Sequence, residues 1–230
     1  MIVNARIMNP LIIADFCLWM KRNRTGTLPH NMRPLFIVLE GPDGGGTTLH
    51  SALLAKRLEA QGLKVLCTFE PTDGPIGTAI RNDLDTGATF SPLELQKRFC
   101  SDRAWHLKEV ISPALRAGST VISDRYTPST LAYGEALGIR REELEKLNKD
   151  FIQPSLVFLL MPPFDVCIRR LKSRAKLDAL EEATFQRRVY DLYAHMAEED
   201  HSIIRIDTSG PKHSAAEEIF ERVKEKMESV

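Results

Sequence analysis

Leu35-Phe-Ile-Val-Leu39 is followed two residues later by Gly41-Pro-Asp-Gly-Gly-Gly-Thr-Thr48, and these two segments decide the fold. The first is an apolar run without polar alternation, which indicates a strand buried on both faces. The second is a glycine-rich loop that leads into a helix expected from about Thr48 to Ala60. Backbone N–H groups of such a loop point inward, and the helix N-terminus adds the positive end of its dipole. The two segments therefore predict a strand, an anion-binding loop and a helix in succession.

The loop follows most of the phosphate-loop pattern G-x-x-x-x-G-K-[ST]. Thr48 fills the Ser/Thr position and is a candidate ligand of Mg²⁺, whereas Thr47 stands in place of the lysine. The sequence holds no lysine between Lys21 and Lys56, so a shifted lysine cannot fill that place. A plain turn between a strand and a helix is the alternative, but a position after the first strand of a parallel sheet favours ligand binding. We expect phosphates to contact Gly41, Gly44, Gly45, Gly46, Thr47 and Thr48.

Four further short apolar segments alternate with helical patterns along the chain. The expected strands span residues 64–68, 120–123, 155–161 and 202–206. Ser91 and Glu94 form the pattern of a capping box that opens a long helix, and Gly118 ends this helix. The last helix places one apolar stripe at Ala216, Ile219, Phe220, Val223 and Met227. Short buried strands separated by helices predict an α/β fold with a five-stranded parallel sheet and helices on both faces.

The composition is that of a soluble globular chain. Of 230 residues, 43% are hydrophobic and 27% are charged, which excludes collagen-like, low-complexity and disordered classes. Thirty-one Lys and Arg residues balance 31 Asp and Glu residues, so no bulk charge favours binding to nucleic acid or to an anionic membrane. The four cysteines have wide, irregular spacings that fit neither a zinc site nor a disulfide framework. We expect free, buried thiols and a cytoplasmic location.

Residues 1–33 differ from the rest of the sequence. The apolar run Leu11–Met20 is shorter than the roughly 20 apolar residues that span a bilayer, and Asp15 interrupts it. Cationic residues follow this run instead of preceding it, which does not fit a secretory signal. A mitochondrial presequence is the alternative, although only Arg6 precedes the run. We expect residues 1–33 to be a disordered or non-essential extension and residues 34–230 to form one domain.

Further motifs stand at the ends of predicted strands or on the long helix. They are Glu70-Pro-Thr-Asp-Gly-Pro-Ile-Gly77, Phe99-Cys-Ser-Asp-Arg103, Asp124-Arg-Tyr126 and Ser129-Thr-Leu-Ala-Tyr133. With the glycine loop, they resemble the thymidylate kinase family in order and spacing over residues 34–228. The resemblance implies a P-loop kinase-type fold with a short lid at about 169–178. It also implies transfer of the ATP γ-phosphate to dTMP, which forms dTDP, with Mg²⁺ as the cofactor.

The resemblance also implies roles for single residues at the dTMP site. Phe99 would stack on the thymine ring, and Arg103, four residues later on the same helix face, would hydrogen-bond the base. Thr130 would help to recognise the base, and Tyr133 would crowd the 2′ position and so favour deoxyribose. Asp43 would contact the 3′-hydroxyl or a metal-bound water near the acceptor phosphate.

The implied phosphate site draws its charged groups from the strand ends and from the lid. Arg125 would hold the acceptor phosphate, and Asp124 would support the Mg²⁺ site together with Thr48. Because Thr47 cannot supply the charge of the usual lysine, we expect a cation of the lid to compensate during phosphoryl transfer. The candidates, in order, are Arg174, Arg170 and Lys176.

Each motif also has an interpretation that assigns it no functional role. Taken alone, Phe99 on a long helix is more typical of a core residue than of a base platform. Arg103 with Asp102 is typical of a surface ion pair, which contributes little to stability. The cations between Arg169 and Lys176 fit a solvated helix face. The six histidines do not cluster with other ligand types, so we assign no metal-ligand or general-base role to them.

Phe69 and Gly134 depart from the family pattern in addition to Thr47. Many bacterial members carry arginine at the place of Phe69 and glutamine at the place of Gly134, positions tied to the acceptor phosphate and to the base. The rival functions are a kinase for another nucleoside monophosphate and a non-catalytic nucleotide-binding protein. Because the other motif residues are retained together, we favour an active enzyme that binds ATP and dTMP. The resemblance also implies a homodimer, and we expect no nucleic-acid or membrane partner.

Overall fold

A five-stranded parallel sheet forms the centre of the molecule. The computed structural model describes residues 33–173 and 179–229, so nearly all of the predicted extension at 1–33 lies outside the described residues. The strand order is β2-β3-β1-β4-β5, which confirms the predicted sheet and puts β1 in the middle. The strands are β1 (Phe36–Glu40), β2 (Val65–Phe69), β3 (Thr120–Asp124), β4 (Leu156–Leu160) and β5 (Ile203–Ile206).

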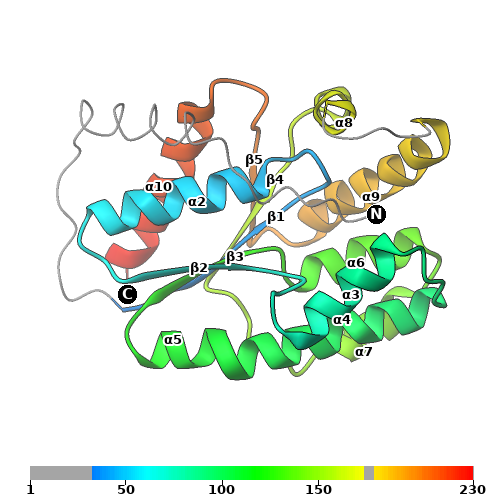
Figure 1. Ribbon diagram of the computed structural model, residues 1–230. Helices are drawn as coiled ribbons and strands as arrows, with labels where there is room; N and C mark the ends of the chain where they lie inside the picture. The colour runs from blue at the N-terminus through cyan, green and yellow to red at the C-terminus, as the bar shows by residue number, and fades with distance from the viewer. Residues whose placement is uncertain (1–32, 174–178, 230) are drawn as a thin grey trace.

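Helices lie on both faces of this sheet (Figure 1). Helices α2 and α10 cover one face, and the helical segments between β2 and β4 cover the other (Figure 1). The helices are α2 (Thr47–Ala60), α3 (Pro75–Asp85), α4 (Pro92–His106), α5 (Ser112–Arg116), α6 (Thr127–Ala136), α7 (Arg141–Asn148), α8 (Phe164–Lys172), α9 (Ala179–Glu199) and α10 (Lys212–Glu228). None of the helices in the described part of the chain is both long enough and apolar enough to cross a bilayer.

Strand β1 is buried on both faces, as its unbroken apolar sequence predicts. Leu35, Ile37 and Leu39 pack into the core beneath α2 and α10. The alternate residues Phe36 and Val38 pack on the opposite face, because successive side chains of a strand point to opposite sides. The predicted stripe of α10 is buried in full at Ala216, Ile219, Phe220, Val223 and Met227. Both covered faces of the sheet are therefore encoded by local apolar patterns.

The long helix that was expected between Ser91 and Gly118 is interrupted by one wider turn. Ser91 caps it with the predicted capping box, in which its hydroxyl accepts from Glu94 N–H. After α4, residues Leu107–Ile111 form a π-helical turn, η1, before α5 begins. Pro113 lies directly beyond this turn and has no N–H to donate, so the regular helical ladder cannot continue through it. Cys100 and Cys167 are free, buried thiols as predicted, whereas Cys67 is free but exposed, so the prediction of a buried thiol is wrong there.

Gly134, one of the departures from the family pattern, faces a neighbouring helix. A Cβ atom at this position would lie 2.6 Å from Cδ2 of Leu144 on α7, and Leu144 is fully buried. The glycine therefore permits α6 and α7 to pack closely. Its effect is on packing between helices, and a longer side chain here would have to displace the Leu144 side chain.

We predict that Gly134→Gln lowers the free energy of unfolding by about 1–3 kcal/mol, because the added side chain overpacks the contact with Leu144. Urea unfolding followed by circular dichroism measures this change. The same exchange at Gly210 is the control, since a Cβ atom there has nothing within 4 Å. Equal stability of the two variants would contradict the close packing of α6 on α7.

Candidate functional site

The glycine loop joins β1 to α2 at the carboxyl edge of the sheet. Gly44 and Gly46 have φ angles of 83° and 100°, in the left-handed region that favours glycine. A Cβ atom on Gly44 would also lie 2.5 Å from the Cys167 carbonyl oxygen, so α8 packs directly against the loop. Gly46 is the residue before the first turn of α2, which starts at Thr47. The structure thus places the glycine loop directly before a helix N-terminus, and phosphate binding by this loop stays a prediction.

Thr48 and Asp124 meet beside this loop. The Thr48 hydroxyl donates to Asp124 Oδ2 at 2.5 Å, although 76 residues separate them in the sequence. The second carboxylate oxygen, Oδ1, is buried and has no hydrogen-bond partner in the described part of the chain. A hydroxyl next to a carboxylate oxygen without a partner offers the hard oxygen ligands that Mg²⁺ prefers. These two residues therefore fit the metal site that the sequence predicts.

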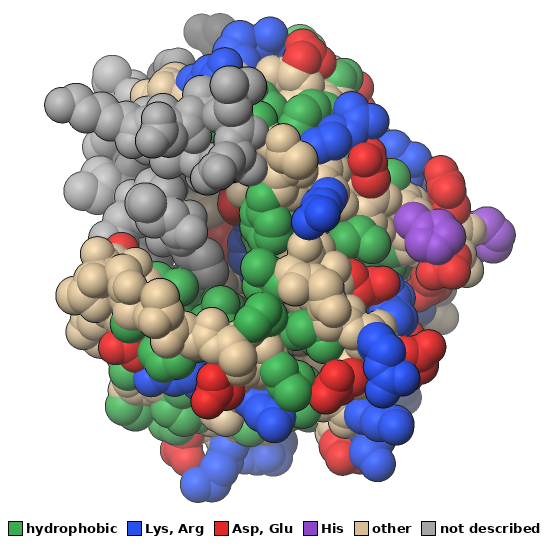
Figure 2. All heavy atoms as spheres, turned by 90° about the vertical axis from the view of Figure 1, so that its right-hand side faces the viewer, with side chains coloured by type: hydrophobic (Ala, Val, Ile, Leu, Met, Phe, Trp, Pro, Cys, Tyr) green, Lys and Arg blue, Asp and Glu red, His purple; other side chains and the backbone are tan. Residues whose placement is uncertain are grey.

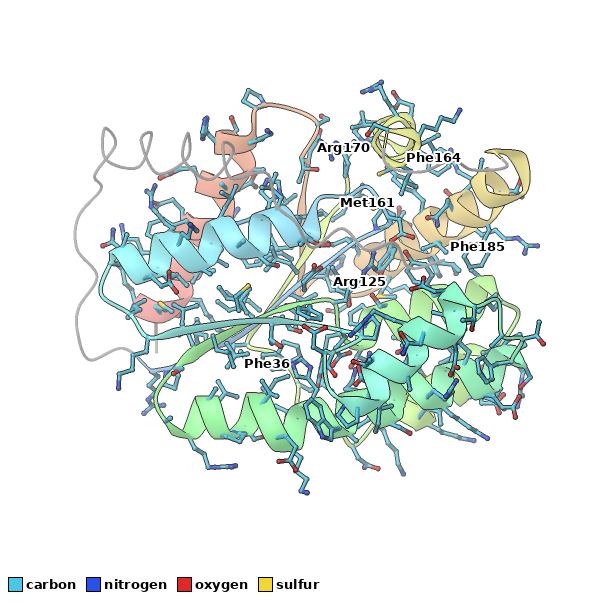
Figure 3. The ribbon with its side chains drawn as sticks, viewed as in Figure 1. Phe36, Arg125, Met161, Phe164, Arg170 and Phe185 are labelled. Carbon is cyan, nitrogen blue, oxygen red and sulfur yellow. The ribbon has the colours of Figure 1, made fainter. Side chains whose placement is uncertain are left out.

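Arg170 on α8 binds the same loop from its other side. Its guanidinium donates to the Gly44 carbonyl oxygen at 3.0 Å and to the backbone oxygen of Thr208 at 2.6 Å. The Thr208 hydroxyl donates in turn to the Gly45 carbonyl oxygen at 2.7 Å. Arg170 lies above the end of the sheet in Figure 3. A cation is thus fixed on a loop that has threonine at the lysine position.

The predicted lid lies only partly within the described residues. Its first residues form the last turn of α8, where the exposed Arg169 pairs with Asp165 at 3.5 Å. The other two candidates for compensation, Arg174 and Lys176, lie outside the described residues. Arg170 is therefore the predicted compensating cation whose contacts the structure describes.

Arg125 connects the loop to the end of β3. Its Nη2 donates to Asp43 Oδ1 at 2.6 Å, and its Nη1 donates to the Gly41 carbonyl oxygen and the Ser129 hydroxyl, both at 3.1 Å. The guanidinium also lies 5.4 Å from the centre of the Tyr133 ring. Arg125 has a φ of 73°, a conformation that costs a non-glycine residue of order 1–3 kcal/mol. The surrounding hydrogen bonds hold the guanidinium at the carboxyl edge in spite of this strain.

Glu40 fixes the turn that presents Arg125. Its buried carboxylate accepts hydrogen bonds from the N–H of Tyr126 at 2.6 Å, from the N–H and hydroxyl of Ser129, and from the Tyr193 hydroxyl at 2.9 Å. Burial raises the pKa of Glu40, and the charge of Arg125 and these hydrogen bonds offset part of that rise. The sequence analysis assigned no role to Glu40.

A cavity of about 330 Å³ opens between the loop, α3, α4, α6 and α9. Every residue that was predicted to bind dTMP lines it, namely Asp43, Phe99, Arg103, Arg125, Thr130 and Tyr133. Leu84, Leu95, Leu137 and Phe185 supply much of the apolar wall. Figure 2 shows this side of the molecule, where apolar side chains form a band across the middle and charged side chains gather toward the edges. Phe185 reaches toward the site from α9 (Figure 3).

Arg103 is buried at the inner end of this cavity. Its Nε donates to Glu70 Oε2 at 2.9 Å, and its Nη2 lies 2.8 Å from the same oxygen in an ion pair. Nη2 also donates to the Tyr126 carbonyl oxygen at 2.9 Å. Its Nη1 donates to the Thr130 hydroxyl at 2.9 Å and to Asn148 Oδ1. Each of the three nitrogens of the guanidinium thus donates to at least one protein acceptor. A hydrogen bond from Arg103 to a base stays a prediction, and it would require one of these bonds to be exchanged.

The interpretation of Asp102 and Arg103 as a surface ion pair is wrong. Both residues are buried, and Arg103 pairs with Glu70 instead. Asp102 accepts hydrogen bonds from the N–H and the hydroxyl of Thr72, at 2.7 and 2.6 Å. Neighbouring residues of a helix point in different directions, so their adjacency in the sequence did not make them partners.

His106 extends this buried network, although the sequence analysis assigned it no role. Its Nδ1 lies 3.1 Å from Glu70 Oε1, and its Nε2 lies 2.7 Å from the Thr68 hydroxyl. The imidazole is fully buried. The three-residue spacing from Arg103 places both side chains on the same side of the helix, and this spacing is the signal that was available in the sequence.

Comparison with known proteins identifies one family. A family model described as thymidylate kinase matches residues 39–219. The chain is 39% identical over 198 residues to the thymidylate kinase of Synechococcus sp. (strain JA-2-3B'a(2-13)), covering 84% of this chain and 96% of that protein. It is 42% identical over 173 residues to the probable thymidylate kinase of Pyrococcus abyssi, covering 73% of this chain and 84% of that protein. It is 33% identical over 196 residues to the thymidylate kinase of Brachyspira hyodysenteriae, covering 84% of this chain and 95% of that protein.

We predict that Glu70→Gln lowers the free energy of unfolding by about 3–5 kcal/mol, because it leaves the charge of Arg103 buried without its counterion. Chemical denaturation measures the difference. Glu145→Gln is the control, since it removes one partner of an exposed ion pair with Arg141 and should change stability by less than about 1 kcal/mol. A Glu70→Gln protein as stable as the control would show that the buried pair does not support the fold.

Proposed function

This chain belongs to the thymidylate kinase family, and we propose that it transfers the γ-phosphoryl group of ATP to dTMP. The observation that supports this most directly is the position of Arg125. Its guanidinium contacts both Gly41 of the phosphate loop and Asp43 of the cavity wall, so it lies where the acceptor and donor sites meet. In the reaction, an oxygen of the dTMP phosphate forms a bond to the γ-phosphorus as the bond to the ADP oxygen breaks.

The cavity fits a pyrimidine deoxynucleotide as the acceptor. The Phe99 ring supplies a surface for stacking, and leucine side chains close the apolar part of the wall. Tyr133 supplies a bulky wall near Arg125, where the sugar of a nucleotide with its phosphate on Arg125 would lie. Burial raises the pKa of the Tyr133 hydroxyl, so this side chain stays uncharged next to the nucleotide.

The phosphates would be held by groups that are already in place. The loop N–H groups would bind the donor phosphates, and the forked guanidinium of Arg125 would grip the acceptor phosphate in a bidentate manner. Thr48 and Asp124 would hold Mg²⁺, which when bound neutralises charge on the phosphate oxygens. Phosphoryl transfer depends mainly on such positioning and charge neutralisation. A homodimer and a cytoplasmic location stay predictions.

The test is an assay of ADP release with ATP, Mg²⁺ and each nucleoside monophosphate in turn. We expect dTMP to give the highest kcat/KM. Clearly higher catalytic efficiency with CMP, UMP or AMP would assign the chain to another nucleoside monophosphate. Nucleotide binding without turnover would instead support the non-catalytic alternative.

We predict that Arg125→Ala raises the KM for dTMP by about tenfold or more and changes the KM for ATP much less, because in the proposed function its fork grips the acceptor phosphate. Steady-state kinetics with each nucleotide varied separately measure the two values. Arg222→Ala on the exposed surface of α10 is the control. Equal increases in both KM values would place Arg125 between the two phosphates or in a structural role.

We also predict that Arg170 compensates for the missing lysine. Arg170→Ala should lower kcat by about 10²-fold, the effect of losing one donor to a transition state, with little change in the KM for dTMP. Thr47→Lys in that background should restore part of the rate, because it returns a cation to the loop. Measurement of kcat at saturating ATP and dTMP decides the question. A kcat of Arg170→Ala within a few-fold of the parent would show that Arg170 only ties α8 to the loop.

A further inference from the structure

Gln96 on α4 carries a buried side-chain amide that lies in the wall of the cavity. It is 1% exposed and lines the same space as Phe99 and Arg103. Its Oε1 is buried without a hydrogen-bond partner among the described residues. Burying an amide without partners is unfavourable, and buried side-chain amides in folded proteins are normally bonded. An unpartnered amide on a cavity wall therefore points to a ligand that completes it.

The spacing along α4 places this amide next to the expected base. Gln96, Phe99 and Arg103 stand three and four residues apart, so their side chains share one face of the helix. A base stacked on the Phe99 ring would present its edge to Gln96 on one side and to Arg103 on the other. Each guanidinium nitrogen of Arg103 already donates to a protein acceptor. The side-chain oxygen of Gln96, in contrast, has no hydrogen-bond partner among the described residues.

We propose that Gln96 is a specificity-determining residue whose carboxamide pairs with the carbonyl and ring N–H edge of a pyrimidine. This inference rests on the proposed function, because it assumes that the cavity takes the base of the acceptor. A carboxamide carries a donor and an acceptor side by side, and thymine offers the complementary O4 and N3–H.

This role and a structural role predict opposite effects on stability. If Gln96 completes its hydrogen bonds only with a ligand, its amide is unpaired in the protein without ligand. Gln96→Leu removes this unpaired amide, so it should raise the Tm of the protein without ligand by about 2–4 °C. The same exchange should raise the KM for dTMP about tenfold, with kcat and the KM for ATP within twofold of the parent. A residue that only supports the fold would lower the Tm on substitution and affect both nucleotides alike.

The experiment compares the parent, Gln96→Leu and Gln96→Met, with Gln153→Leu as the same exchange at an exposed position. Each protein is assayed with dTMP and with its N3-methyl derivative, which lacks the ring N–H. We expect the parent to discriminate against the methylated nucleotide and both Gln96 variants to lose about tenfold of that discrimination. The control should behave as the parent does.

Suppose that the Gln96 variants keep the parent's kcat. If they also keep its discrimination between dTMP and the N3-methyl derivative, or its KM for dTMP, the inference is overturned and the proposed function stands. If the parent does not turn over dTMP, the proposed function fails, and calorimetric Kd values for dTMP and the N3-methyl derivative provide the same comparison. A parent that neither phosphorylates nor binds dTMP overturns both.

Discussion

The pairing of Arg125 with Asp43 is the contact on which the organisation of the site depends. The two residues belong to loops that are 82 positions apart, one after β1 and one after β3. Because β1 and β3 are neighbours and run in parallel, both loops emerge at the same edge of the sheet. The buried Glu40 carboxylate holds the turn after β3, and the left-handed backbone of Arg125 then directs its guanidinium toward the glycine loop.

The fold was predictable because its signals are local. An apolar run such as Leu35–Leu39 specifies a buried strand wherever it occurs, and Ser91 with Glu94 specifies a helix start through its own hydrogen bonds. Strand order did not follow from such signals, since it depends on contacts between distant segments. The π-helical turn before Pro113 was also missed, because a proline near the end of a helical pattern is compatible with several local solutions.

The sequence predicted which residues belong to the site better than it predicted which residues they contact. The motif residues Asp43, Phe99, Arg125 and Tyr133 do line one cavity. Partners were harder to predict, since Glu70 lies 33 residues before Arg103 and no local pattern connects them. The glutamine at position 96 carried no signal at all, because its significance comes from what surrounds it and a sequence does not show that an amide lacks a partner.

The contact between Gly44 and the backbone of Cys167 limits how this protein can evolve. Backbone atoms, not a side chain, fill the space next to Gly44, so no substitution at position 167 can make room for a larger residue in the loop. A mutation that shifts the glycine loop must therefore be accompanied by a matching shift of helix α8.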